Sequence, residues 1–181
     1  MSNRREFLRA AGLLASAAVL PGCGYSLAGR GSFLPATIRV IGIPEFVNNT
    51  PLFEVEKRIT QKVRSEFIGR GRYTVRPEAN AVDALLTGEI STITVAPAAI
   101  TEDRQASRYV ITVTTKIEFR DVKADKVLWA NPYLQFRDDF ELSNTPDVTD
   151  PTAFLGQDVN ALERLASELA RTIVSAILEA F

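Results

Sequence analysis

Residues 108–120 alternate between apolar and polar side chains, and this alternation limits the fold more than any other feature of the sequence. Five apolar residues share one parity: Tyr109, Ile111, Val113, Ile117 and Phe119. The other parity carries Thr112, Thr114, Lys116, Glu118 and Arg120. Because successive side chains of a strand point to opposite faces, the stretch predicts a sheet with one buried and one solvated face. Such a sheet needs a second layer to cover its apolar face.

Two stretches with helical periodicity can supply that layer. The first has apolar residues at helical spacing, namely Leu52, Val55, Ile59, Val63 and Phe67. The second has Leu162, Leu165, Ala166, Leu169, Ile173 and Ile177. The pairs Thr50-Pro51 and Asp150-Pro151 are expected to cap the two helix starts. The Gly69-Arg70-Gly71 segment is expected to end the first helix.

Four further strands are expected, at residues 37–43, 73–75, 84–96 and 127–140. The apolar parity changes between Ile90 and Ile93, which predicts a bulge near Ser91. Pro132 places the last strand at a sheet edge or indicates a bulge there. The predicted fold is α+β, a two-layer sandwich with both helices on one face of the sheet. Six residues are predicted to be buried between the layers: Ile59, Val63, Ile111, Val113, Leu165 and Leu169.

The N-terminal stretch has the pattern of an export signal. Arg4 and Arg5 precede an uncharged run over residues 10–19, and the segment 20–23 ends in the only cysteine of the chain. The paired arginines resemble a twin-arginine signal, and the Leu-x-Gly-Cys ending resembles a lipobox whose cysteine is lipidated. We therefore expect a signal over residues 1–22, a lipidated tether over 23–36 and one domain over 37–181. The alternative is that Cys23 is a small apolar residue in an ordinary helix.

The residues that catalysis or metal binding most often uses are scarce. The chain has no histidine, and its one cysteine is assigned to the anchor, so no Ser-His-Asp triad or histidine metal ligand is possible. Asp138 and Asp139 are adjacent in an expected strand, where their side chains point to opposite faces. No phosphate-binding loop or nucleic-acid motif is present. The sequence predicts a binding or assembly protein that is not an enzyme and uses no metal and no cofactor.

Several segments together resemble the lipopolysaccharide-assembly lipoprotein family (LptE-like). They are Cys23-Gly24-Tyr25, Leu34-Pro35, the run Ile41-x-Ile43-Pro44-x-Phe46-x-Asn48-x-Thr50, the helix over 52–67 and Gly71-Arg72-Tyr73. The resemblance implies two helices on one face of a mixed four-stranded sheet. It also implies a lipid-anchored protein on the periplasmic face of the outer membrane. Such a protein plugs an LptD-like β-barrel and helps to insert lipopolysaccharide into the outer leaflet. The twin-arginine signal departs from the family, which leaves the export route open.

A second interpretation of the same features is a freestanding periplasmic lipoprotein that binds a lipid or a peptide without a barrel partner. The two interpretations differ in whether a large β-barrel protein is bound to the native protein.

Lipopolysaccharide, the ligand that the resemblance implies, carries phosphate, so cations are the candidate contacts. Residues 57–76 hold seven basic residues against Glu66, whereas residues 137–181 hold three basic and nine acidic ones. One candidate group is Arg70, Arg72 and Arg76, with Tyr73 among them. The other is Lys116 and Arg120 on the solvated face, with Lys123 and Lys126 at the following turn. The alternative is that these are solubilising surface charges.

Overall fold

The computed structural model describes residues 34–70, 72–100, 106–141 and 159–181. All of them belong to one compact unit, Ser32–Phe181. The export signal, Cys23 and the Asp150-Pro151 cap lie outside the described residues. Leu34 is 5% exposed and packs in the core, so the core begins three residues before the boundary at residue 37.

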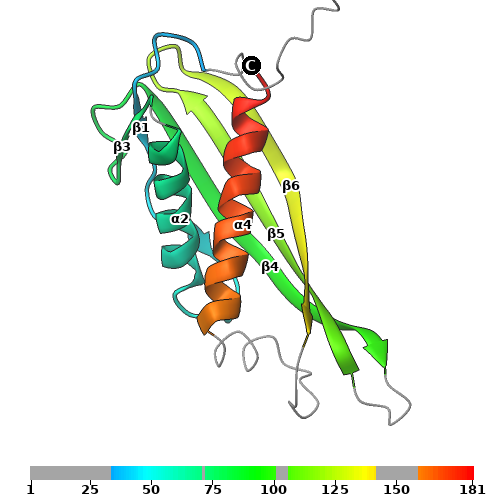
Figure 1. Cartoon of the computed structure of the whole chain (residues 1–181). Helices are drawn as coiled ribbons and strands as arrows, with labels where there is room; N and C mark the ends of the chain where they lie inside the picture. Colours follow the sequence, from blue (N-terminus) through cyan, green and yellow to red (C-terminus); the bar gives the residue numbers. More distant parts are fainter. Residues whose placement is uncertain (1–33, 71, 101–105, 142–158) are drawn as a thin grey trace, which may run out of the picture. The chain divides into compact units, whose positions relative to one another are not determined.

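The sheet is mixed and is built around a three-stranded antiparallel meander (Figure 1). The meander consists of β4 (Ala84–Ile100), β5 (Ala106–Asp121) and β6 (Lys126–Glu141). Three short strands pair in parallel beside it: β1 (Val40–Gly42), β2 (Val47–Asn48) and β3 (Thr74–Arg76). The strand order is β3-β1-β4-β5-β6, and β2 also pairs with β4.

The four-stranded sheet that the resemblance implies was therefore wrong, because the described part of the sheet has six strands, of which the residue pattern predicted five. The strand that the sequence analysis missed is β2, which has only two residues. Two residues cannot display an alternation of polarity, and Pro44 and Asn49 on either side indicate a loop.

Both described helices, α2 (Val55–Gly69) and α4 (Val159–Leu178), cover the same face of the sheet (Figure 1). They run parallel to each other, since Arg58 contacts Glu163 and Arg70 contacts Ser175 with the same sequence separation of 105 residues. The predicted two-layer arrangement of helices on one sheet face is confirmed.

The core lies between the helices and the meander, as the parity of β5 predicts. The odd-numbered residues of β5 from Tyr109 to Phe119 are buried, and both predicted helix stripes are buried as well. All six predicted core residues are fully buried: Ile59, Val63, Ile111, Val113, Leu165 and Leu169.

The two predicted irregularities of the long strands are also confirmed. The register of β4 against β5 shifts between Ile90 and Thr92, which makes Ser91 the extra residue of a bulge. Because of this bulge, Ile93 pairs with Val113 on the helix side of the sheet. Strand β6 forms the sheet edge, and its register shifts between Asn131 and Leu134, around Pro132.

The start of the first helix differs from the expectation. Helix α2 begins at Val55, and its N-cap Glu54 has a left-handed backbone (φ 65°) and makes no capping hydrogen bond through its side chain. Thr50 is instead held by Asn48, whose Oδ1 accepts hydrogen bonds from the Thr50 backbone N (2.9 Å) and Oγ1 (2.7 Å). Asn48 Nδ2 donates to Leu52 O at 2.8 Å. Local Asx and threonine bonds therefore form a loop where the sequence analysis placed a helix cap.

Truncating a residue of the buried parity should cost far more than truncating its neighbour. We expect Ile111→Ala to lower the free energy of unfolding by about 2–5 kcal/mol, because it removes buried methylenes and leaves a cavity. Thr112→Ala, on the solvated side, should change it by less than about 0.5 kcal/mol. Urea unfolding of both variants measures the difference, and equal losses would show that the two faces of β5 are assigned wrongly.

Gly88 should not tolerate even a methyl group. A Cβ at this position would lie 2.5 Å from the ring of Phe46, which is 3% exposed. We expect Gly88→Ala to destabilise the fold by about 1–3 kcal/mol through this overlap. Gly69→Ala is the matched control, since a Cβ on Gly69 meets no atom within 4 Å. Thermal unfolding of the two variants tests this, and a Gly88→Ala variant as stable as the control would contradict it.

Candidate functional site

The face of the β4–β6 meander turned away from the helices is polar, and we call it the outer face. Thr92 pairs with Thr114 and Thr94 pairs with Thr112, so hydroxyl groups form two cross-strand pairs near its middle. Among the described side chains, its charged residues by register are Glu89, Arg108, Lys116, Glu118, Arg120, Arg137 and Asp139. Of the five predicted contact residues, Lys116 and Arg120 lie on this face, as the alternation predicted.

Lys116 lies at a hollow of about 210 Å³ on the outer face. The hollow is lined by Val47, Thr87, Gly88, Glu89, Lys116 and Glu118. Its two carboxylates already have partners, because Glu89 Oε1 accepts from Asn49 Nδ2 at 2.6 Å and Glu118 Oε1 accepts from Arg120 Nε at 3.1 Å. The exposed Lys116 ammonium has no side-chain hydrogen bond or ion pair within the described residues. It is available to a ligand.

Arg120 is in a different electrostatic situation. Its guanidinium lies 2.7 Å from Asp125 Oδ1 and 3.1 Å from Glu118 Oε1. These bonds, to Asp125 first and then to Glu118, raise the pKa of Arg120 above its usual value. Two carboxylates therefore already neutralise the charge of Arg120, which was predicted to bind an anion.

The group Arg70, Arg72 and Arg76 lies on the other side of the sheet order, because β1 and β4 separate β3 from β5. Arg70 NH2 binds Glu66 Oε1 at 3.0 Å and Ser175 Oγ at 3.1 Å, which ties the end of α2 to α4. Arg72 and Arg76 are exposed, and the Arg76 guanidinium has no bonded partner in the part of the chain that the structure describes. Tyr73 packs edge-on against Phe67 and accepts a hydrogen bond from the Leu34 backbone N.

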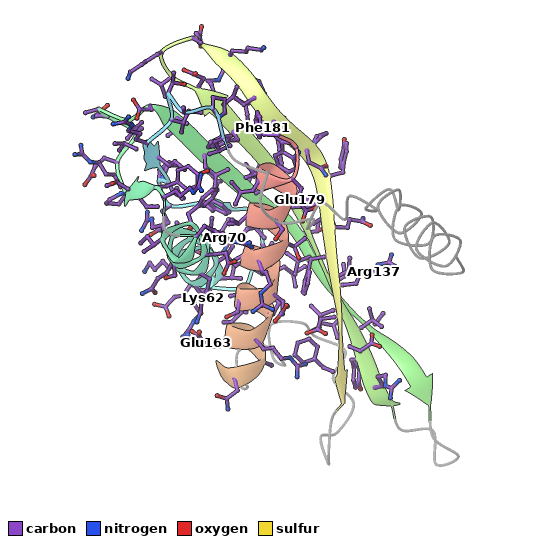
Figure 2. The ribbon with its side chains drawn as sticks, turned by 45° about the horizontal axis from the view of Figure 1, so that its top comes forward. Lys62, Arg70, Arg137, Glu163, Glu179 and Phe181 are labelled. Atoms are coloured by element: carbon purple, nitrogen blue, oxygen red, sulfur yellow. The ribbon has the colours of Figure 1, made fainter. Side chains whose placement is uncertain are left out.

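The basic surplus of residues 57–76 is largely structural. Arg58 and Lys62 both bind Glu163 of α4, at 2.8 and 2.7 Å, as Figure 2 lets the reader follow for Lys62. Lys62 first, and then Arg58, lower the pKa of Glu163. Arg64 donates from Nε and NH2 to Ile43 O, at 2.9 and 2.6 Å. These three cations are therefore bound within the fold, to α4 or to the Ile43 backbone.

Arg137 is a residue of the outer face that the sequence analysis missed. It pairs with Thr112 in the β5–β6 register, and Figure 2 shows its side chain on the side of β6 away from α4. It is exposed and has no bonded partner among the described residues. The signal was present, because the inward residues Leu134 and Phe136 alternate with Gln135 and Arg137.

Lys123, at the turn that was predicted to bind an anion, is already paired with Asp83. Asp83 Oδ1 lies 2.6 Å from Lys123 Nζ, and its Oδ2 accepts from the backbone N of Arg39 (3.0 Å) and Val40 (2.9 Å). The bond to Lys123 and then those two amides hold the pKa of Asp83 well below its usual range. The same contact raises the pKa of Lys123. This carboxylate joins the start of β1 to the β5–β6 turn.

The match to a family model decides the affiliation of the chain. The model described as "LptE: Lipopolysaccharide-assembly" matches residues 38–177, which include almost all of the described domain. The chain belongs to the LptE family. The resemblance seen in the sequence is thereby confirmed. No curated protein matches the sequence.

Solved structures share the fold at low identity. The hypothetical protein CT253 from Chlamydia trachomatis superposes with a TM-score of 0.51 and 10% identity, over 77% of this LptE-family chain and 95% of that one. The uncharacterized lipoprotein B from Nitrosomonas europaea gives a TM-score of 0.51 and 12% identity, over 86% and 90%. At these identities the likeness establishes the fold alone.

Two kinds of feature are absent from the residues that the structure describes. No group of three or more Asp, Glu, His or Cys side chains in that part of the chain is placed to hold a metal ion. Among the helices of that part, none combines the length and the apolarity that crossing a membrane requires.

The depressed pKa of Asp83 predicts a pH-dependent loss of stability. A carboxylate whose pKa is lower in the folded state stabilises the fold above its unfolded pKa of about 4, and the contribution disappears as the pH falls through the folded value. We expect Asp83→Asn to be less stable than the wild type at pH 7, with a gap that narrows below about pH 4. Urea unfolding between pH 3 and 7 measures the gap. Asp125→Asn, whose side chain is 86% exposed, should show no comparable gap, and a gap for Asp83→Asn that stays constant with pH would refute the assignment.

Proposed function

We propose that this LptE-family lipoprotein is anchored to the outer membrane through Cys23 and plugs an LptD-like β-barrel that inserts lipopolysaccharide into the outer leaflet. The observation that carries the proposal is the family match over residues 38–177. A lipobox-like segment over residues 20–23, upstream of the matched domain, supports the anchor, because an N-terminal lipidated cysteine would tether the domain to the membrane.

The surface of the domain is compatible with a polar barrel lumen. The large apolar side chains that the described residues expose come from separate segments: Val47, Phe53, Ile68, Val122, Val127, Tyr133 and Phe181. The lumen of an outer-membrane barrel is polar, so a plug needs a mostly polar surface. We propose a role in binding and assembly rather than catalysis, since the chain has no histidine and its one cysteine precedes the domain.

The hollow at Lys116 gives little support to the alternative, a freestanding lipoprotein that binds a lipid or a peptide. Its volume of about 210 Å³ is below the ~300–1,000 Å³ of sites that bury a small molecule.

Contact with lipopolysaccharide is a prediction for all five cations named from the sequence. The five can be ranked by whether their side chains already have a bonded partner. Lys116 and Arg76 have no bonded side-chain partner among the described residues, whereas Arg70 and Arg120 are bound to carboxylates. Arg72 is exposed. A charge that already has a carboxylate partner gains less from a phosphate, so Lys116 and Arg76 rank first.

Purification of the native protein tests the barrel partner. We expect a C-terminally tagged chain, extracted from membranes in mild detergent, to retain a large β-barrel protein that mass spectrometry identifies as LptD-like. A second tagged outer-membrane lipoprotein of unrelated fold serves as the control and should retain none. Recovery of the tagged chain without any barrel, at full yield, would favour the freestanding alternative.

The anchor is tested by its cysteine. We expect Cys23→Ser to move the protein from the outer-membrane fraction to the soluble or unprocessed fraction, because the acyl chains that bury methylenes at ~0.8 kcal/mol each are lost. Mass spectrometry of the wild-type N-terminus should show a lipidated Cys23. An unmodified thiol there would exclude the anchor.

A further inference from the structure

We propose that residues 135–139 of β6 form a strand-pairing surface for a second copy of this chain, and that Arg164 and Asp138 keep this surface closed in the monomer. The sheet order leaves β6, with its 16 residues, as an edge strand (Figure 1). The backbone N–H and C=O groups of a long edge strand can pair with another strand, and proteins protect such edges. The proposal depends on neither the barrel partner nor lipopolysaccharide.

The middle of β6 is unsuited to pairing. Pro132 has no backbone N–H, and the Tyr133 backbone N donates to Asn131 Oδ1 at 2.9 Å. The register against β5 also shifts between Asn131 and Leu134. The longest uninterrupted part of the edge is therefore the part that follows this bulge.

Within that part, the backbone of Asp139 faces the free edge. Its N–H donates to Asp138 Oδ1 at 2.9 Å, and its carbonyl oxygen accepts from Arg164 NH2 at 3.3 Å, so neither group is turned to β5. In an antiparallel ladder the N–H and C=O of one residue point to the same side, and residues two apart point alike. The backbone groups of Gln135 and Arg137 therefore face the same edge, and no backbone bond from a described loop or turn reaches them.

Arg164, near the start of α4, covers this edge through three contacts. Besides its bond to the Asp139 carbonyl, its Nε lies 3.4 Å from Asp138 Oδ2, and its guanidinium carbon lies 4.2 Å from the centre of the Phe140 ring. Arg164 and Asp138 together occupy the acceptor and the donor of Asp139 that a partner strand would need. Such a strand must displace both bonds, so these two side chains favour the monomer.

Charge complementarity identifies a second copy of the chain as the occupant. A two-fold axis through Asp138, perpendicular to the sheet, places each residue opposite the residue equally far beyond the axis. Arg137 then lies opposite Asp139 of the second copy on the outer face. On the helix side, Phe136 lies opposite Phe140 of the second copy. Moving the axis by one residue would place Arg137 opposite Arg137, or Asp139 opposite Asp139.

The residues that would meet in this register are available, apart from those at its axis. Neither the Arg137 guanidinium nor the Asp139 carboxylate has an ion pair within the described part of the chain. Each Arg137–Asp139 pair can also exchange two backbone hydrogen bonds. The two Asp138 carboxylates would meet at the axis, and their repulsion is a second reason for the closed form to be favoured.

Sedimentation of the detergent-solubilised full-length protein tests the proposal. We expect the wild type to be a monomer, and Arg164→Ala with Asp138→Ala to dimerise with a dissociation constant at least about tenfold lower than that of the wild type. The matched control, Arg171→Ala with Glu168→Ala, removes another exposed ion pair of α4 and should stay monomeric. Thermal unfolding verifies that the variants are folded, and Arg164→Gln alone, which should give part of the effect, replaces the double variant if that is unstable.

A charge exchange tests the register. In the background of Arg164→Ala with Asp138→Ala, Arg137→Asp places two carboxylates opposite each other and should restore the monomer. Adding Asp139→Arg creates the opposite charges again in reverse order and should restore the dimer.

A cysteine on the axis tests the symmetry. Asp138→Cys with Arg164→Ala should form an intermolecular disulfide on a non-reducing gel, because a residue on the axis lies directly opposite itself, within reach of such a bond. Gln135→Cys with Arg164→Ala is the control. Three positions from the axis, its two copies are about 20 Å apart along the strands, so it should not cross-link.

Three outcomes would overturn the proposal. The first is a double variant as monomeric as the wild type. The second is a dimer that neither the charge exchange nor the cysteine on the axis reports, because the copies would then meet through another surface. The third is an assembly larger than a dimer, since a two-fold axis joins two copies only.

Discussion

The burial of one face of the β4–β6 meander beneath two helices is the constraint on which the rest of the structure depends. A strand such as β5, in which apolar and polar residues alternate almost throughout, is stable only if its apolar parity is covered. Helices α2 and α4 provide this cover together, and their stripes are fully buried from Val55 to Phe67 and from Leu165 to Ile177. The opposite parity is left to solvent or to a ligand, so the packing that stabilises the domain also creates its outer face.

The parallel course of the two helices explains most of the charge pattern. Parallel helices bring like ends of their dipoles together, which is unfavourable, so contacts between their side chains must hold them in that arrangement. Arg58 and Lys62 converge on Glu163 near the start of α4, and Arg70 reaches Ser175 near its end. Several of the basic residues in the segment 57–76 therefore bind across the interface between the helices. Among the described residues, cations without a bonded partner, such as Lys116 and Arg76, lie on the sheet.

Much of the fold could be predicted because its signals are local. The parity of residues 108–120, the two helical stripes, the parity change at Ser91 and the break at Pro132 each depend on near neighbours in sequence. The helix start predicted at Thr50 was wrong because Asn48 and Thr50 favour both a cap and an Asx-type loop, and the structure has the loop. Strand β2 was missed because two residues hold no period.

The sequence by itself determined the fold class, the core residues and the family, because periodicity and motif spacing can be recognised without knowing which distant residues are in contact. Only the tertiary structure decided which cations are available, because several of the ion pairs join residues far apart in the chain. Lys123 meets Asp83 across 40 residues and Arg58 meets Glu163 across 105, whereas Arg137 comes to the face of Lys116 through strand register alone. Charge can be read from a sequence, but its neutralisation depends on which side chains the fold brings within a few ångströms.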